Sequence, residues 1–457
     1  MKDVYASVID LIGRTPIVRL NRMGRDTGAT FYAKLEYLNP GASIKDRIAV
    51  QMIADAEASG ALKPGGTIVE CTSGNTGMGL ALVGAARGYR TVLVMPDKVS
   101  EEKVKALRAF GARVVTTPTA VQPADPRSYY SVARRIAEET PGAFFANQYQ
   151  NMSNPLSHEK TTGPEIWEQM GQDLDAIVIA SGTGGTISGI ARVVKKLKPS
   201  IQMVCVDPLG SIYYDLWKSG KMITTTKSYK VEGFGEDFMP GTMDFKCVDE
   251  VIQVNDKECF LGARELTRTE GLFTGGSGGG AAAGAIKYAR AHPERKTILI
   301  LLPDSGSRYL SKVFDDDWMR ENSFLDDGTR HGTVADLVAK RQESLVWANP
   351  GDSVMAVIRQ MKSHGISQIP VLDGGKLLGM IVEVTLLKAM LNDPATTDRP
   401  VADMVAHNYT LVAPDTPVGK LASIFTTGHV ALVQDAGRIT AVLTNIDFID
   451  YLAGALN

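Results

Sequence analysis

A lysine with unusual surroundings stands at position 45, in the segment NPGASIKDR (39–47). A turn of Asn, Pro and Gly precedes it and a helical pattern follows, so Lys45 is predicted at a helix N-terminus. That end of a helix carries about +0.5 charge, which lowers the pKa of an amine. The neutral amine that results is what a Schiff-base lysine needs. The competing interpretation is a solvated lysine paired with Asp46.

A second candidate is TSGNTG (72–77), which lies between an apolar run at 67–71 and a helical stretch at 77–88. Backbone N–H groups and small hydroxyls at a helix N-terminus form an anion site, which would suit a substrate carboxylate. A tight turn capped by Ser73 or Thr76 explains the same residues equally well.

A third candidate is SGTGGT (181–186), again between a strand-like run and a helix. Successive glycines let the backbone approach a phosphate closely, and Thr183 and Thr186 add hydroxyls. The lysine of a P-loop is missing, which disfavours a nucleotidase. Glycine-permitted packing of a helix on a sheet is the alternative.

The fourth candidate, TGGSGGGAAAGA (274–285), contains the spacing GxGxxA. It comes late in the chain, and the run before it, LFT (272–274), is short for a strand, so a dinucleotide site is disfavoured. Ser277 could offer a neutral hydroxyl to a ring nitrogen.

These candidates have to be positioned by short apolar runs that alternate with amphipathic segments. Such alternation is typical of an α/β protein whose parallel sheets are covered by helices on both faces. The predicted strands are 67–71, 91–95, 113–117, 176–180, 202–206, 251–255 and 297–302. The predicted helices are 77–88, 100–111, 186–198 and 256–271, the last with Asp256 as N-cap and Gly271 as stop.

The pattern changes after about residue 315. Residues 315–332 are polar and acidic, as in a linker, and an internal repeat follows in which TVADLV (333–338) recurs as PVADMV (400–405). Two copies of about 60 residues are fewer than the three that a solenoid needs. A pseudo-symmetric pair forming one small module is therefore predicted.

Composition excludes several classes of protein. The 457 residues are 44% apolar and 22% charged, with a net charge of -2, so a global basic field for nucleic acid or anionic lipid is absent. The N-terminal 16 residues lack a signal-peptide core, and apolar runs fall short of the roughly 18 residues of a membrane helix. The 4 cysteines show no CxxC pair. A cytoplasmic protein that binds neither nucleic acid nor membrane, with no metal site, is expected.

The motifs, in this order, resemble the fold-type II family of pyridoxal-phosphate enzymes. IGRTPIVRL (12–20) and the four segments above match its landmarks across residues 5–310. SEEKV (100–104), NQYQNMSNPLSH (147–158) and EGFGEDFMP (232–240) resemble its cystathionine beta-synthase branch more than its O-acetylserine sulfhydrylase branch. The repeat resembles a tandem CBS pair, or Bateman module.

The resemblance implies an α/β fold with two doubly wound parallel-sheet lobes. It implies a catalytic domain over 1–325, with a mobile lobe at about 42–146, a linker at 326–332, and CBS domains at 333–395 and 396–457. A homodimer or higher homo-oligomer is expected.

The resemblance also implies roles for single residues. Lys45, Tyr149 and Ser277 would be catalytic, with Lys45 bound covalently to pyridoxal 5'-phosphate and Ser277 at its ring nitrogen. The other implied cofactor residues are Asn75, at the ring oxygen, and Gly182, Thr183, Gly184, Gly185 and Thr186, at the phosphate. The implied substrate-carboxylate residues are Thr72, Ser73, Thr76 and Gln148.

Two departures from the family pattern stand out. Only residues 1–11 precede the first motif, so the haem-binding extension of the animal enzymes is not expected. Glu236 replaces a tyrosine that is frequent in the EGxGxDF segment, which leaves its role open.

The implied reaction is β-replacement, in which L-serine and L-homocysteine give L-cystathionine and water. Several alternatives stay open. The donor could be O-acetylserine, and the acceptor could be sulfide, as in a cysteine synthase. The protein could also release hydrogen sulfide from cysteine, act as a serine or threonine dehydratase, or be a catalytically silent scaffold. In the second CBS copy, Thr444 and Asp447 match a phosphate or ribose site for S-adenosylmethionine or an adenine nucleotide. Val382 and Thr385 replace them in the first copy, and a purely structural module is the alternative.

Overall fold

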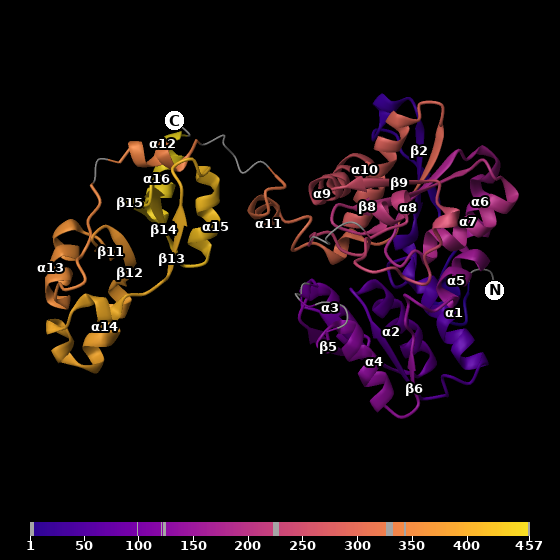
Figure 1. The fold of residues 1–457 in the computed structure, drawn as a ribbon, viewed down its shortest axis with the longest axis horizontal. Helices are drawn as coiled ribbons and strands as arrows, with labels where there is room; N and C mark the ends of the chain where they lie inside the picture. Colours follow the sequence, from indigo (N-terminus) through magenta and orange to yellow (C-terminus); the bar gives the residue numbers. More distant parts are fainter. Residues whose placement is uncertain are drawn as a thin grey trace. The chain divides into compact units, whose positions relative to one another are not determined.

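The computed structural model describes residues 4–97, 99–119, 121, 125–222, 228–325, 332–341 and 344–455. The chain forms two compact units, Met1–Asp315 and Asp316–Asn457, whose elements are labelled in Figure 1. Within the described ranges, no helix is both long and apolar enough to cross a membrane.

The larger sheet of the first unit has six strands, and all neighbouring pairs are parallel except β1 with β2. In sheet order the strands are β1 (Ile17–Arg19), β2 (Thr30–Leu35), β10 (Thr297–Leu302), β7 (Ala176–Ala180), β8 (Gln202–Pro208) and β9 (Glu250–Val254). Strand β7 is apolar throughout, and β10 is apolar after Thr297, because both faces are covered.

The smaller sheet has four parallel strands. In sheet order they are β5 (Arg113–Thr117), β4 (Arg90–Pro96), β3 (Thr67–Cys71) and β6 (Ala143–Phe145). Alternate residues of β3 enter different cores, since Ile68 packs with α1 and α2 whereas Val69 packs with α4. Both sheets of this unit are therefore doubly wound, as predicted.

Ten α-helices cover these sheets in the described part of the first unit. They are α1 (Lys45–Ala58), α2 (Asn75–Arg87), α3 (Glu101–Ala109), α4 (Tyr129–Glu139), α5 (Ser153–Lys160), α6 (Thr162–Met170), α7 (Gly185–Leu197), α8 (Tyr213–Ser219), α9 (Asp256–Glu265) and α10 (Gly276–Ala291). Helices α6, α7 and α8 pack on one face of the larger sheet and α10 on the other.

Helix α1 belongs to both hydrophobic cores. Ile44, directly before it, packs in the core of the larger sheet, while Ile48 and Met52 pack in the core of the smaller sheet. The first turn of α1 is also fixed by charge, because Arg47 contacts Glu36 at 2.8 Å and Glu165 at 2.7 Å.

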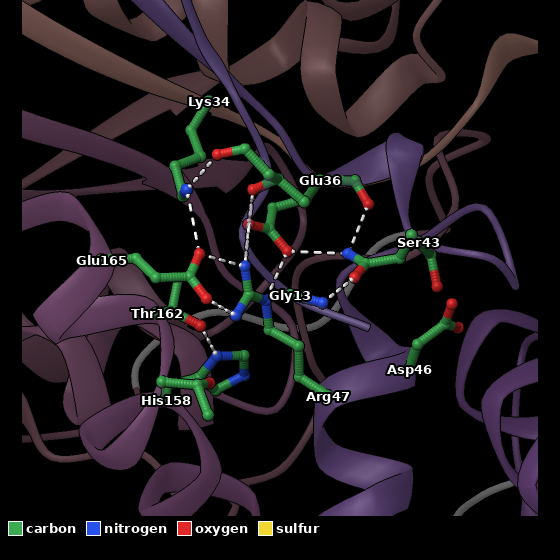
Figure 2. A network of polar contacts seen from close by, with 12 residues as sticks. Gly13, Lys34, Glu36, Ser43, Asp46, Arg47, His158, Thr162 and Glu165 are labelled. Atoms are coloured by element: carbon green, nitrogen blue, oxygen red, sulfur yellow. Dashed lines mark hydrogen bonds and ion pairs between the residues drawn. The ribbon is translucent and has the colours of Figure 1, made fainter. Parts of the chain in front are cut away.

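Figure 2 shows this charged network from close by: Arg47 lies between the two carboxylates, and Lys34 reaches Glu165 from β2 at 3.1 Å. The side chains of Arg47, Glu36 and Lys34 are almost entirely buried. The paired cations hold the pKa of Glu165 at about 2, against the opposing effect of burial. The start of α1 is therefore tied to β2 and α6 of the larger lobe.

The predicted strands coincide with observed ones, but one predicted cap is wrong. The N-cap of α9 is Asn255, which accepts from Glu258 N while the Glu258 side chain accepts from Asn255 N. This capping box has two reciprocal hydrogen bonds and leaves Asp256 as the first helical residue. The predicted stop is confirmed, since Gly271 is left-handed with φ +71° after the π-helical turn Leu266–Glu270.

The second unit begins with helix α11 (Asp316–Glu321), inside the stretch predicted to be linker. Most of the linker proposed at 326–332 lies outside the described residues. The remaining elements are α12 (Val334–Ala339), α13 (Val354–His364), β11 (Gln368–Asp373), β12 (Lys376–Val382), α14 (Glu383–Asn392), β13 (Tyr409–Val412), α15 (Leu421–Thr426), β14 (Val430–Asp435), β15 (Arg438–Leu443) and α16 (Asn445–Ala455).

The predicted repeat is confirmed by equivalent pairings in this unit. Val412 pairs in parallel with Val433 in the second copy, and Ala348 forms a parallel bridge with Val371 in the first. The opening segments are exchanged: α12 packs in the core of the second copy, while Val401 packs in the core of the first. The core of the second copy is therefore completed by a segment of the first copy, and the core of the first copy by a segment of the second.

We expect Arg47→Met to lower the free energy of unfolding of the first unit by about 3–5 kcal/mol, because it leaves the Glu36 carboxylate buried without its cation. Urea unfolding followed by circular dichroism measures this. Arg87→Met is the matched control, since its pair with Glu57 is partly exposed and worth at most about 1 kcal/mol. Equal losses in the two variants would contradict the importance of the network.

Candidate active site

A cavity of about 260 Å³ opens where the carboxyl ends of strands from both sheets meet. It is lined by segments that follow β3, β6 and β7, together with Lys45 and a loop near residue 235. Of the predicted site residues it brings together Lys45, Thr72, Ser73, Asn75, Thr76, Gln148, Tyr149, Gly182 and Thr183. A narrower cavity of about 30 Å³ shares Lys45 and adds Gly184, Thr186 and Ser277.

Lys45 is the first residue of α1, as predicted, and its side chain lines both cavities. Burial lowers the pKa of its amine to about 8, against the opposing charges of Glu236 and Asp304. Desolvation is therefore the leading cause of the lowered pKa, whereas the sequence suggested the field at the helix N-terminus. A neutral amine becomes accessible close to physiological pH.

The alternative of a solvated ion pair with Asp46 is wrong. The Asp46 carboxylate is buried and accepts from the backbone N–H of Gly41 at 2.5 Å. Burial raises its pKa to about 7. The Lys45 side chain therefore lines the cavities instead of pairing with Asp46.

The segment after β3 presents hydroxyls toward the larger cavity. Thr72 accepts from the N–H groups of Gly74 and Gly77, which folds the loop into a concave turn. Thr76 donates to Gln148 Oε1 at 2.5 Å, and Gln148 donates to the carbonyl of Cys71. The Ser73 hydroxyl has no hydrogen-bond partner within the described structure.

This geometry removes the capping role from the alternative interpretation of TSGNTG. The N-cap of α2 is Gly74, with φ +130° and no side-chain cap, so neither Ser73 nor Thr76 caps the helix. A side chain at position 74 would also meet Lys103 at 2.8 Å. Thr72, Ser73 and Thr76 line the cavity, and an anion site formed by them stays a prediction.

The segment after β7 forms a cradle that a side chain would fill. A Cβ atom at Gly182 would lie 2.9 Å from the Gly233 carbonyl, and one at Gly184 would lie 2.5 Å from Met243. At Gly185 it would collide with Asn154. The N–H groups at the start of α7, which begins at Gly185, are therefore left open to an anion.

Buried polar side chains contact the hydroxyls of both threonines of the cradle, Thr183 and Thr186. Asn154 donates to Thr183 Oγ1 at 3.0 Å, so the Thr183 hydroxyl keeps its proton for another acceptor. His158 lies 3.2 Å from Thr186 Oγ1 and 2.9 Å from Thr162 Oγ1. Burial, with the charges of Lys45 and Arg47, lowers the pKa of His158 well below its usual value, so this imidazole is neutral.

Ser277 is the second residue of α10, is 3% exposed, and lines the narrower cavity. The glycines around it serve close helix packing: a Cβ atom at Gly262 would lie 2.6 Å from the Gly279 carbonyl. The GxGxxA spacing thus lies inside a helix that packs on α9, which agrees with the exclusion of a dinucleotide loop.

Sequence reasoning missed the polar group that holds Asn75. Asn75 donates to Asp304 at 2.8 Å and accepts from Arg308, while Tyr309 donates to Asp304 at 2.5 Å. All three partners lie in PDSGSRYL (303–310), directly after β10. A polar segment at the carboxyl end of a parallel strand was the signal that could have found them.

An ion pair across the two lobes was missed as well. Lys103 of α3 contacts Glu232 at 2.6 Å, and Lys312 contacts the same carboxylate at 2.7 Å. The pair is buried, and Lys103 also lies 4.4 Å above the ring of Tyr309. Partners 129 residues apart in sequence leave no local pattern.

Tyr149 lies in an aromatic wall of the cavity. Its hydroxyl is 3.2 Å from that of Tyr129, and its ring packs edge-on against Tyr130 and Phe238. Burial raises the pKa of Tyr149 well above its usual value, so the hydroxyl is neutral.

Thr444 and Asp447 lie in the second unit, where β15 gives way to α16. The N–H and hydroxyl of Thr444 both donate to Asp447 at 2.7 Å, and Arg341 contacts the other carboxylate oxygen at 3.2 Å. The structure thus places these two residues side by side, and adds Arg341 to them.

Family comparisons assign both units. Residues 8–304 match the model of the pyridoxal-phosphate dependent enzymes, and residues 334–392 and 401–454 each match the CBS domain. Cystathionine beta-synthase of Dictyostelium discoideum is 37% identical over 99% of this chain and 93% of its own length. The chain belongs to the cystathionine beta-synthase family.

Other relatives of this cystathionine beta-synthase family member match the first unit alone. A Bacillus subtilis protein named "Probable cysteine synthase" is 42% identical over 68% of this chain and 98% of its own length. The crystal structure of O-ureido-L-serine synthase is 38% identical, with a TM-score of 0.63, over 69% of this chain and 99% of that one.

The cofactor of this cystathionine beta-synthase family member is pyridoxal phosphate, and the residues present fit it. The glycine cradle and open helix N-terminus suit a phosphate, and the neutral amine of Lys45 lies in the cavity that joins them.

The rate at which the apoprotein captures pyridoxal phosphate covalently should rise with pH, level off at high pH and have its midpoint near pH 8. Below that pH Lys45 is protonated and cannot attack the aldehyde, whereas an ordinary lysine would titrate near 10.4. Stopped-flow absorbance across pH 6–10 measures it, with Lys45→Ala as the unreactive control. A midpoint near 10 would contradict the depressed pKa.

Proposed function

We propose that the protein condenses L-serine with L-homocysteine to give L-cystathionine and water. The observation that carries the proposal is one cavity in which the neutral amine of Lys45 faces both the hydroxyl loop after β3 and the glycine cradle after β7. The full-length relatedness to a cystathionine beta-synthase supports these substrates.

The hydroxyl loop would hold the carboxylate of the donor amino acid. Ser73 offers an unused hydroxyl, and Gln148 is held in place by Thr76 and Cys71. A carboxylate fixed there leaves the Cα hydrogen of the donor near Lys45, since both lie in the same cavity.

Lys45 would act as general base and then as general acid. Its neutral amine takes the proton from Cα and passes it to the β-hydroxyl, which leaves as water. The same amine then takes the thiol proton as the sulfur bonds to the β-carbon, and it returns that proton to Cα. When bound, pyridoxal phosphate delocalises the electron pair released at Cα.

Ser277 would set the electronics of the ring. A neutral hydroxyl near the pyridine nitrogen does not stabilise a proton there as a carboxylate would. The weaker electron sink favours β-replacement over transamination. Tyr149, with its neutral hydroxyl, would be a hydrogen-bond donor within the same wall.

Purified protein should show the absorbance band of a lysine-bound cofactor and should form cystathionine from serine and homocysteine. Lys45→Ala should lose the band and lower turnover by roughly 10²–10⁴-fold, because it removes the general base. Lys63→Ala, an exposed lysine, is the matched control. A Lys45→Ala protein that keeps both properties would end the assignment.

Cysteine synthesis from O-acetylserine and sulfide is the second candidate, favoured by the match of the first unit to the Bacillus subtilis protein. Cystathionine formation from O-acetylserine is a variant of it. Steady-state kinetics with both donors and both acceptors distinguishes them, and pyruvate release without thiol would indicate a dehydratase. Homodimer formation and a cytoplasmic location stay predictions.

The CBS pair is proposed to hold one adenosyl ligand, near Thr444 and Asp447. We expect calorimetry to detect binding of S-adenosylmethionine, AMP or ATP, and Asp447→Ala to abolish it. Thr385→Ala is the matched control, because the first copy lacks the Thr and Asp pair at these positions. No heat with any of the three compounds would remove the sensing role.

A further inference from the structure

The cavity has an acidic wall that the proposed chemistry does not use. The segment 228–237 lines it and contributes three carboxylates, those of Glu232, Glu236 and Asp237. Among the described lining residues, Lys45 is the sole basic residue. Because an α-amino acid enters as a zwitterion, the placement of these charges decides which end of it faces which wall.

The three carboxylates differ in their surroundings. Glu232 is buried between Lys103 and Lys312, so its charge is already neutralised. Asp237 is exposed to solvent, which screens its charge. Glu236 is half-buried, and its field raises the pKa of Lys45, which burial lowers. Of the three, Glu236 is the carboxylate whose charge acts on Lys45, in the reacting part of the cavity.

The backbone fixes Glu236 in place. Its N–H donates to Ser211 at 3.0 Å, and its carbonyl accepts from the N–H of Ile212 at 3.1 Å. Gly235, left-handed at φ +76°, turns the chain just before it. A carboxylate on a backbone held in this way can serve as a positioned counter-charge.

The donor amino acid already has a place for its own carboxylate, at the hydroxyl loop opposite. The acceptor approaches the Cβ atom of the donor. The hydroxyl loop is then already occupied by the donor carboxylate. The α-ammonium of the acceptor would be attracted to Glu236, whereas hydrosulfide, an anion, would be repelled.

We propose that Glu236 binds the α-ammonium of the acceptor and thereby selects an amino-acid thiol over inorganic sulfide. The inference rests on the proposed function, since it assumes that a thiol adds to the β-carbon of the bound donor. It makes Glu236 a determinant of acceptor specificity, and it explains why a carboxylate is useful at this position.

The test compares kcat/KM at saturating serine for homocysteine, for 4-sulfanylbutanoate, which has the same chain without the amine, and for sulfide. The wild type should prefer homocysteine over 4-sulfanylbutanoate by at least about tenfold, which corresponds to about 1.4 kcal/mol. Glu236→Gln should remove that preference and lower the homocysteine-to-sulfide ratio by at least the same factor.

Asp237→Asn is the matched control, because it removes the same charge from the next residue, and both ratios should change less than twofold. If Glu236→Gln keeps the wild-type ratios, or if Asp237→Asn changes them equally, the inference is overturned while the proposed function stands. If the wild type forms no thioether from serine and homocysteine, the proposed function fails and this inference with it.

Discussion

The proposed mechanism needs Lys45 to supply a neutral amine inside a cavity that also receives anions. Burial lowers the pKa of this amine to about 8, while Glu236 and Asp304 pull it upward. Exposing the amine to solvent would raise its pKa, and removing the two carboxylates would lower it. The placement of the two sheets, which together bury the amine, is therefore inseparable from its reactivity.

In the proposed site, anions would be met by dipoles and hydroxyls instead of by cations. The loop after β3 and the cradle after β7 both precede a helix, and Lys45 is the sole cationic residue among the described residues lining either cavity. A second lysine or arginine would lower the pKa of Lys45 further and would compete for the same anions. Backbone N–H groups bind an anion without that effect, since they carry no net charge.

Much of this architecture could be predicted from local patterns. Apolar runs located the strands, and the glycine segments located the loops at their carboxyl ends. The cap of α9 was wrong because Asn255 and Asp256 are both good capping residues, and the reciprocal bond of Glu258 decides between them. The contacts of Asn75 with Arg308, and of Lys103 with Glu232, could not be predicted, since they join residues more than a hundred positions apart.

One helix that takes part in two hydrophobic cores limits how the lobes can move. Pulling them apart would expose either Ile44 or Ile48 to water, which would cost free energy. A point on a rotation axis moves least, and Lys45 stands at the start of this helix, where Arg47 ties it to the larger lobe. If the lobe predicted at about 42–146 turned about this helix, the walls of the cavity would therefore be displaced more than Lys45 itself.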